Sequence, residues 1–366
     1  CIRDRFHHLL GNETMLQQTV HRLEGLCQAE QLIVIGNREH RFMIADQLAE
    51  IGWHNANVLL EPVGRNTAPA VAMAAFAAQE MSADATLLVL AADHVIKDTD
   101  AFRSTVKENL SFADDGKLIT FGIPASRPDT GFGYIHCAEK LSANAFRVDA
   151  FVEKPDNQTA AEYVAAGDYF WNSGMFLFQA KVYLEELAKY QPEIYKCCKD
   201  AWTKREKHFH DFQAFDEEAF SRCPSMSIDY AVMEHTENAV MATLDAGWND
   251  VGSWSALHQE LGQDEKGNAS RGDVMMQGTR DCLLYAHDRL LVTSGLKDIV
   301  IVETSDAVLV ADRNQSHEIG VLAKQLQQQG RAEASLHCRA FRPWGSYTVL
   351  EKSPGYQVKR LSLKPG

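Results

Sequence analysis

Two aspartates stand at positions in the sequence that suit a ligand-binding site. The run from Leu87 to His94, L-L-V-L-A-A-D-H, has the pattern of a buried strand and stops at Asp93. Far downstream, D-A-G-W-N-D-V-G-S-W sets Asp250 among glycines and tryptophans. In open α/β sheets, ligands collect beyond the carboxyl ends of the strands. The two carboxylates are therefore candidates for sharing one divalent cation.

Mg²⁺ is the cation that such a pair of carboxylates suits. Carboxylate oxygens are hard ligands, and Mg²⁺ keeps several waters while it bridges substrate phosphates. Phosphoryl and nucleotidyl transfer require mainly positioning and charge neutralisation from the protein. Either Asp93 or Asp250 alone could instead be a helix cap.

A polar turn precedes an alanine-rich segment with helical spacing. The sequence E-P-V-G-R-N-T-A contains Arg65, Asn66 and Thr67, and the helix is predicted to start near Pro69. One interpretation is an ordinary helix entry in which Asn66 and Thr67 are caps. The other is a nucleotide-binding loop, in which Arg65 meets phosphate and its neighbours bind base or ribose.

A third group of residues is suited to a sugar phosphate. F-V-E-K-P contains Glu153 and Lys154, which point to opposite faces of a strand unless the strand bends or ends there. A carboxylate can bind sugar hydroxyls, and an ammonium can meet the sugar phosphate. Asn172, in W-N-S-G, offers a second hydroxyl contact, and Gly133 allows close approach of the backbone. An exposed edge strand and ordinary aromatic packing are the alternatives.

His208 and His210 form an H-F-H pair in a charged segment. Because no acidic or cysteine partner follows at ligand spacing, a solvated surface segment is the favoured interpretation over a metal site.

Helical and strand patterns alternate through the first third of the chain, as expected of an α/β fold with parallel strands. Past Pro124 the pattern changes, and the segments 130–135 and 146–155 are predicted to be strands inserted around a cleft instead of further strands and crossovers of the sheet. The predicted helices are 14–29, 41–51, 68–81 and 102–112, and the predicted strands are 31–36, 57–60, 86–91, 117–123, 130–135, 146–155 and 169–178.

Near residue 263 the composition changes to short β-type segments. Strands of this length, separated by regular turns, indicate a small sheet or a stacked β-helical coil, closed by an amphipathic helix over 319–330. The predicted domains are an α/β domain over 1–262, a short β domain over 263–335, and a connector with the start of a further domain over 336–366.

Composition excludes several classes of protein. The chain has 366 residues, 45% of them hydrophobic, which is enough for a sizeable core. Its formal charge of -14 has the wrong sign for a nucleic-acid binder. No apolar run reaches the roughly 20 residues of a membrane span, and eight scattered cysteines indicate free thiols in a reducing cytosol. The expected location is the cytoplasm.

Taken in order, six motifs together resemble one enzyme family. They are E-P-V-G-R-N-T-A-P-A, L-A-A-D-H, F-V-E-K-P, Y-F-W-N-S-G-M-F, S-I-D-Y-A-V-M-E and G-W-N-D-V-G-S-W. They resemble mannose-1-phosphate guanylyltransferases, more narrowly the bacterial bifunctional type that also carries phosphomannose isomerase activity. The resemblance covers nearly the whole chain. It implies a Rossmann-like (GT-A-like) nucleotidyltransferase domain with a mixed sheet, then a small β-helix-like domain.

The resemblance also implies substrates and residue roles. Mannose 1-phosphate would attack the α-phosphorus of GTP, giving GDP-mannose and pyrophosphate. Asp93 and Asp250 would hold Mg²⁺, and Lys154 would contact the sugar phosphate. Glu153, Asn172 and Gly133 would bind mannose, while Arg65, Asn66 and Thr67 would lie near the nucleotide. A homo-oligomer is compatible with the sequence.

Both ends of the chain depart from the family pattern. The first strand, the G-G-x-G-x-R-L loop and a P-K-Q-F segment should precede L-L-G-N-E-T-M-L, where R-D-R-F-H-H stands instead. We expect a truncated chain whose turnover suffers, since that loop supplies donors to the triphosphate. R-P-W-G-S-Y leads toward a cupin isomerase domain that we expect to be missing, and with it isomerase activity.

Two rival hypotheses stay open at this point. One is a catalytically degenerate protein that binds a sugar nucleotide in a regulatory role. The other is a nucleotidyltransferase for another hexose or base, against which W-N-S-G-M-F and R-N-T-A-P-A favour mannose and guanine.

Overall fold

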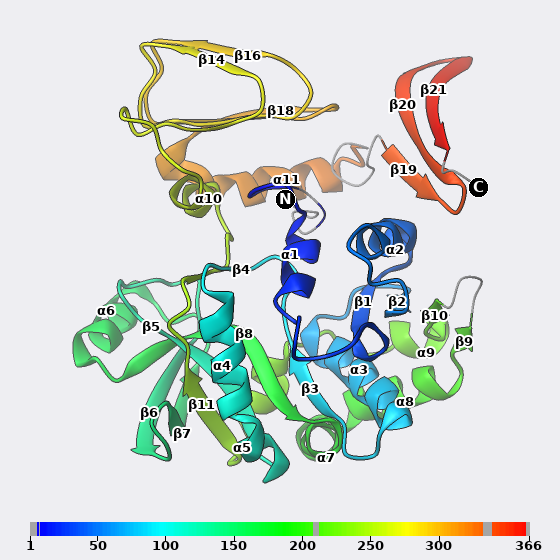
Figure 1. The fold of residues 1–366 in the computed structure, drawn as a ribbon, viewed down its shortest axis with the longest axis vertical. Coiled ribbons are helices and arrows are strands. Elements are labelled where there is room, and N and C mark those ends of the chain that lie inside the picture. Colours follow the sequence, from blue (N-terminus) through cyan, green and yellow to red (C-terminus); the bar gives the residue numbers. More distant parts are fainter. Residues whose placement is uncertain (1–5, 7, 208–211, 332–338, 364–366) are drawn as a thin grey trace. The chain divides into compact units, whose positions relative to one another are not determined.

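The computed structural model describes residues 6, 8–207, 212–331 and 339–363 of the chain. The predicted surface pair His208 and His210 lies outside these residues. The chain divides into two compact units. We call Leu16–Trp248 the sheet unit, and Cys1–Met15 with Asn249–Gly366 the β-helix unit. Figure 1 shows their elements in chain order.

Six strands form the main sheet of the sheet unit, in the order β3-β8-β5-β11-β7-β6. β5 and β11 run parallel, whereas β8 runs antiparallel to both β3 and β5. β3 and β5 therefore run in the same direction, as predicted, but they do not pair with each other, because β8 lies between them and runs in the opposite direction. The strands are Thr86–Val89 (β3), Leu118–Pro124 (β5), Tyr134–Lys140 (β6), Ala145–Val152 (β7), Tyr169–Gln179 (β8) and Ala239–Thr243 (β11).

The segment after Pro124 belongs to this sheet. We expected strands inserted around a cleft, and that expectation is wrong. β7 pairs with β11, and β6 pairs with both β7 and β8. These pairings make β6 and β7 the continuation of the main sheet.

A smaller sheet contains β1 (Ile33–Asn37) and β2 (Asn57–Glu61), which run parallel as predicted. The two-residue strands β10 (Gln213–Ala214) and β9 (Glu206–Lys207) extend it beyond β2. A short β4 (Val95–Ile96) follows β3.

The main sheet has an apolar cluster on each face. Along β8, Phe176 and Phe178 belong to one cluster, while Met175 and Leu177 belong to the other. This alternation follows from the two-residue period of a strand. Helices α3, α7 and α8 contribute to the first cluster, and α4 and α5 to the second (Figure 1). The helices of the unit are Met15–His21 (α1), Arg41–Glu50 (α2), Thr67–Met81 (α3), Thr99–Glu108 (α4), Leu110–Asp114 (α5), Asn157–Ala166 (α6), Ala180–Tyr190 (α7), Pro192–Thr203 (α8) and Glu217–Ser221 (α9).

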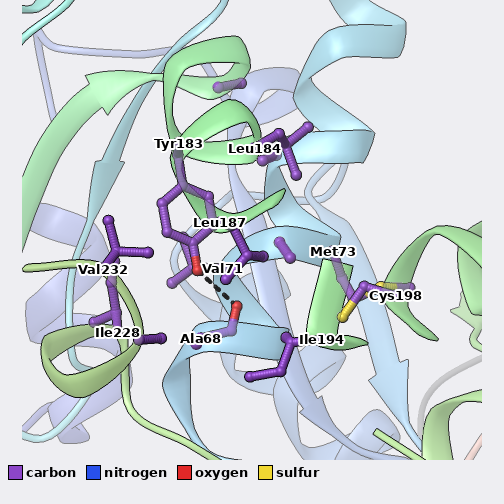
Figure 2. Close-up of a cluster of buried hydrophobic side chains, with 14 of the residues drawn as sticks. Ala68, Val71, Met73, Tyr183, Leu184, Leu187, Ile194, Cys198, Ile228 and Val232 are labelled. Carbon is purple, nitrogen blue, oxygen red and sulfur yellow. Dashed lines mark hydrogen bonds between the residues drawn. The ribbon is translucent and has the colours of Figure 1, made fainter. Parts of the chain in front are cut away.

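The first cluster packs against the amino-terminal end of α3. Figure 2 shows the buried Tyr183 from α7, whose hydroxyl donates to the carbonyl oxygen of Ala68 at 2.8 Å. Ile228 and Val232 lie beside this ring. They come from the segment that includes a π-helical turn, Asp229–Met233. The cluster therefore packs against two segments that carry predicted motifs.

Strands β13 to β18 of the β-helix unit form a stack of short strands, and β19, β20 and β21 form a separate antiparallel sheet. β13, β15 and β17 pair in parallel, as do β14 and β16, and β18 runs antiparallel to β17. Gly272 allows this stacking, since a side chain there would meet the carbonyl group of Ala286. The elements are Trp254–Glu260 (α10), Ala269–Arg271 (β13), Val274–Gln277 (β14), Leu283–Ala286 (β15), Leu291–Ser294 (β16), Ile299–Glu303 (β17), Val308–Asp312 (β18), Ile319–Gln328 (α11), Arg339–Arg342 (β19), Gly345–Ser353 (β20) and Tyr356–Leu363 (β21). The predicted mixed α/β sheet followed by a short β-helix is confirmed.

Candidate active site

The loop after β3 carries the first predicted metal ligand, Asp93, which is half-buried. Its neighbour His94 is fixed from two sides. The Trp248 indole donates to His94 Nδ1 at 3.2 Å, and the rings pack edge to face with centroids 5.3 Å apart. The Arg22 guanidinium donates to the His94 carbonyl oxygen at 2.5 Å. The contacts of His94 therefore hold the backbone next to Asp93 in place.

Arg22 is a functional candidate that the sequence reasoning missed. It is only 3% exposed, and burial lowers the pKa of its guanidinium to about 10. It donates to the Thr19 hydroxyl, and its own carbonyl oxygen accepts from Arg103 Nε at 3.1 Å. The sequence signal was a single arginine following an apolar helical pattern, which does not reveal a contact with residue 94.

Asp250, the second predicted metal ligand, lies in the β-helix unit. Its Oδ1 accepts from the Gly252 amide at 3.1 Å, and Asn249 Oδ1 accepts from the Val251 amide at 2.9 Å. Val251 has a φ of 47°. A β-branched residue rarely adopts this conformation, and such strain clusters at functional sites. Because Asp93 and Asp250 belong to different units, a shared metal ion stays a prediction.

The turn before α3 is tied to the chain around residue 226. The Arg65 guanidinium donates to the Ser221 carbonyl oxygen, and the Arg65 carbonyl oxygen accepts from the Met226 amide. The Thr67 hydroxyl accepts from the Ile228 amide at 2.9 Å. Arg65 and Thr67 thus have contacts within the protein, and their role at a nucleotide stays a prediction.

Asn66 is the N-cap of α3. Its side chain accepts from the Thr67 amide at 2.8 Å, so the helix begins at Thr67 instead of near Pro69. Asn66 has a φ of 67° and is exposed. The amino-terminal end of this 15-residue helix presents backbone donors that suit an anion.

Glu153 and Lys154 lie together just past the end of β7, which stops at Val152. Lys154 has a φ of 51°, so the chain leaves the extended conformation there. Lys154 Nζ lies 3.1 Å from Glu153 Oε1, although strand geometry alone would separate the two side chains. The Glu153 side chain is 11% exposed and that of Lys154 is 59% exposed. The pair therefore presents an accessible cation beside a largely buried carboxylate.

Gly133 and Asn172 join this pair. The Asn172 amide donates to the Gly133 carbonyl oxygen at 2.8 Å. A Cβ atom at Gly133 would lie inside van der Waals contact of Glu153 Oε2 and 3.4 Å from Asn172 Cβ. The predicted sugar-binding residues are thus brought to one place, and glycine at 133 leaves room for the carboxylate.

The Asn172 side chain makes three hydrogen bonds within the protein. Its Nδ2 donates to Asp229 Oδ1 at 2.7 Å. Its Oδ1 accepts from the Thr120 hydroxyl and from the Gly174 amide, each at 3.1 Å. Only 9% of the residue is exposed.

Asp229 and Glu234 bring further negative charge to the cluster. Burial, followed by repulsion from Glu153, raises the pKa of Asp229. Burial also raises the pKa of Glu234, and Glu153 and Asp229 add to that effect against an opposing contribution from His235. Both residues stand in S-I-D-Y-A-V-M-E, which was recognised as a motif without a role for either carboxylate.

A magnesium ion would find hard oxygen donors in both aspartates. Across residues 6, 8–207, 212–331 and 339–363, no three His, Cys, Asp or Glu side chains converge in a way that could hold a metal. Mg²⁺ commonly binds through one or two carboxylates and completes its coordination with water and substrate phosphate.

No helix in the described part of the chain is long and apolar enough to cross a membrane.

Known proteins resemble this chain along its length. The family model for Nucleotidyl transferase matches residues 5–267, and that for the MannoseP isomerase/GMP-like beta-helix domain matches residues 272–326. The mannose-1-phosphate guanylyltransferase of Escherichia coli K12 is 48% identical, over 99% of this chain and 77% of its own length. The chain belongs to the mannose-1-phosphate guanylyltransferase family. The resemblance drawn from the six motifs is confirmed.

Another relative and two solved structures also match this chain. The alginate biosynthesis protein AlgA of Pseudomonas aeruginosa is 45% identical, over 99% of this chain and 75% of its own length. A structure from Thermus thermophilus, described as a mannose-1-phosphate geranyltransferase, matches with a TM-score of 0.74 at 29% identity, covering 86% of this chain and 90% of that one. A mannose-6-phosphate isomerase from Helicobacter pylori gives 0.61 at 31% identity, covering 67% of this chain and 94% of that one.

One expectation is corrected by these comparisons. We expected the isomerase domain of the bifunctional family members to be missing. The family model for Mannose-6-phosphate isomerase C-terminal matches residues 329–366. Strands β19 to β21 therefore belong to a segment that resembles that domain.

Proposed function

We propose that the chain transfers the guanylyl group of GTP to mannose 1-phosphate, giving GDP-mannose and pyrophosphate. The observation that carries the proposal is the convergence of Glu153, Lys154, Gly133 and Asn172 at the end of β7. A carboxylate, an amide and an accessible ammonium at one place suit a phosphorylated sugar. Family membership supports the same reaction, and neither line of support favours the regulatory alternative.

In this proposal, the chain positions two anions for an in-line displacement. A phosphate oxygen of mannose 1-phosphate forms a bond to the α-phosphorus, and the bond from that phosphorus to the bridging oxygen breaks, so pyrophosphate leaves with the electron pair. Lys154 neutralises the attacking sugar phosphate, and Glu153 and Asn172 hold the sugar. Arg65, Asn66 and Thr67 would lie near the nucleotide.

The residues that would hold Mg²⁺ are Asp93 and Asp250, and Mg²⁺ supplies charge neutralisation to the triphosphate when bound. The chain's part is to fix the two carboxylates. Arg22 and Trp248 anchor His94 beside Asp93, while the Gly252 amide holds one oxygen of Asp250.

Pyrophosphate release with GTP, mannose 1-phosphate and Mg²⁺ tests the proposal, together with calorimetric binding of GDP-mannose. We expect Lys154→Gln to lower kcat/KM for mannose 1-phosphate by about 100-fold, as for loss of one preorganised charged group. Lys181, on α7 and paired with Asp84, has a side chain that is 43% exposed and gives the matched control Lys181→Gln, which should stay within about twofold.

Three outcomes would contradict the proposal. The chain could bind GDP-mannose without releasing pyrophosphate, which would indicate a binding protein. It could prefer another hexose 1-phosphate or another nucleoside triphosphate. Lys154→Gln could also behave like Lys181→Gln, which would remove the phosphate role of Lys154.

A further inference from the structure

The Asn172 side chain is held in one orientation by partners that allow no other. The Gly174 amide can only donate, so the atom of Asn172 that faces it must be Oδ1. On the opposite side Nδ2 donates to Asp229, whose ionised carboxylate can only accept. The orientation therefore follows from the chemistry of its neighbours.

This orientation leaves Asn172 with one kind of interaction to offer. The two lone pairs of Oδ1 are taken by Thr120 and Gly174. One Nδ2 hydrogen is taken by Asp229, and a second hydrogen remains. Asn172 can thus donate one hydrogen bond to a ligand and cannot accept one.

Glu153 offers the opposite interaction at the same place. Its Oε2 and Asn172 Cβ both border the position that a side chain at Gly133 would fill. An ionised carboxylate accepts and cannot donate. The cluster therefore contains one donor and one acceptor whose roles cannot be exchanged.

We propose that Asp229 is a positioning residue that keeps Asn172 as a hydrogen-bond donor to a hydroxyl oxygen of the hexose 1-phosphate, while Glu153 accepts from a hydroxyl. The inference rests on the proposed function and adds a specificity determinant outside the predicted sugar-binding residues. Asp229 reaches Asn172 from a π-helical turn, a backbone form that occurs frequently at functional sites.

The electrostatics of Asp229 agree with this role. Asp229 lies close enough to Glu153 for the two carboxylates to repel each other, and it is largely buried. A merely structural partner for Asn172 could be a neutral acceptor that avoids the cost of a buried charge. The ionised carboxylate at 229 accepts and cannot donate, so it supports the orientation of Asn172 that the Gly174 amide also requires.

Three variants separate positioning from structure. Asp229→Ala removes the acceptor, and KM for mannose 1-phosphate should rise about tenfold or more, as for loss of a hydrogen bond to a substrate hydroxyl, while KM for GTP stays within about twofold. Asp229→Asn keeps an acceptor oxygen, and KM should stay within about threefold of the wild-type value.

The third variant reverses the polarity of the pair. In Asn172→Asp/Asp229→Asn, residue 229 donates and residue 172 accepts, so the hydrogen bond between them is kept. Thr120 and Gly174 can still donate to residue 172. Thermal stability should stay close to that of the wild type, because the pair still contains one buried carboxylate, but the donor to the sugar is lost and KM for mannose 1-phosphate should be raised.

Deoxy substrates identify the hydroxyl that Asn172 contacts. With 2-, 3-, 4- and 6-deoxy mannose 1-phosphate, one deoxy position should raise KM for the wild type and add nothing further in Asp229→Ala. GDP-mannose and its deoxy forms give the same comparison by calorimetry.

Two results would overturn the inference. One is a polarity-reversed variant that binds mannose 1-phosphate as the wild type does, since the pair would then be structural. The other is an Asp229→Ala variant that changes both KM values equally. Absence of pyrophosphate release and of GDP-mannose binding in the wild type would instead contradict the proposed function, before any variant is compared.

Discussion

The buried Arg22 guanidinium donates to the carbonyl oxygen of His94 at 2.5 Å, across 72 residues of sequence. This contact joins the end of α1 to the loop that carries Asp93. Because burying a charge is costly, the arginine contributes little net stability, whereas its geometry fixes the backbone beside a predicted metal ligand. Replacing the Arg22 side chain should therefore lower the turnover rate more than the stability of the fold.

The variant Arg22→Met tests this separation. Methionine fills similar space without the charge, so we expect the midpoint of thermal unfolding to fall by a few degrees at most, about 1 kcal/mol. We expect kcat to fall about 10- to 100-fold, since small misplacements of catalytic groups have effects of this size. Arg147→Met, at an exposed position on β7, is the control. A large loss of stability with full activity would show that Arg22 is structural only.

Gly133 makes a separate prediction for the sugar site. In Gly133→Ala the new methyl group would meet the Glu153 carboxylate and displace it. KM for mannose 1-phosphate should rise about tenfold or more, with KM for GTP nearly unchanged, as for loss of one positioned polar contact. Gly262→Ala, where a Cβ would meet nothing within 4 Å, is the matched control. Equal effects of the two substitutions would argue against a sugar contact at Glu153.

Sequence patterns correctly predicted the structural features that depend only on residues close together in the chain. The strand that ends before Asp93 and the cap at Asn66 are local features, and helical spacing indicated α3 closely. The order of strands was not predictable, because antiparallel insertion of β8 depends on pairings between distant segments.

The contact between Asp229 and the predicted sugar-binding residue Asn172 was missed for the same reason. Asn172 and Asp229 are 57 residues apart, and no periodicity reports their contact. The motif around Asp229 marked the segment, but only the fold shows that its carboxylate accepts from Asn172 and is repelled by Glu153.

Asp229 makes a prediction about pH and stability. Burial and repulsion from Glu153 raise the pKa of its carboxyl in the folded chain above its ordinary value. The folded state therefore binds more protons than the unfolded state between the ordinary and the raised pKa, and stability falls as pH rises through that window. Asp229→Asn removes this cost and should be more stable at neutral pH by about 1 kcal/mol, or roughly 2–4 °C.

Thermal unfolding followed by circular dichroism from pH 4 to pH 8 measures this effect. The advantage of Asp229→Asn over the wild type should shrink as pH falls and the native carboxyl becomes protonated. An advantage that grows toward low pH would mean that the pKa of Asp229 is lowered in the folded chain. The control Asp149→Asn, at an exposed aspartate on β7, should not show this pH-dependent gain in stability.

Asp250 tests the proposed metal role. Asp250→Asn keeps an oxygen for the Gly252 amide, so its fold and unfolding temperature should be unchanged. Without the negative charge, kcat should fall about 10²- to 10³-fold, and the Mg²⁺ concentration for half-maximal rate should rise. Asp245→Asn, exposed in the same motif, should behave like the wild type. An unchanged Mg²⁺ dependence in Asp250→Asn would exclude it as a ligand.

Glu303 is the position in the β-helix unit where we expect a substitution to cause a large loss of stability. Its buried Oε2 accepts from three consecutive backbone amides, those of His287, Asp288 and Arg289, at 2.9, 2.9 and 3.2 Å. Glu303→Ala would leave this turn without its acceptor and should cost about 2–4 kcal/mol, since hydrogen bonds to charged groups contribute most. Hydrogen exchange of the amides in β15 and β17 should then be about 30- to 1,000-fold faster, because their local opening becomes easier. Glu265→Ala, at an exposed position of the same unit, should leave these rates unchanged. If the two variants exchange alike, the turn is held by its backbone conformation and not by the carboxylate.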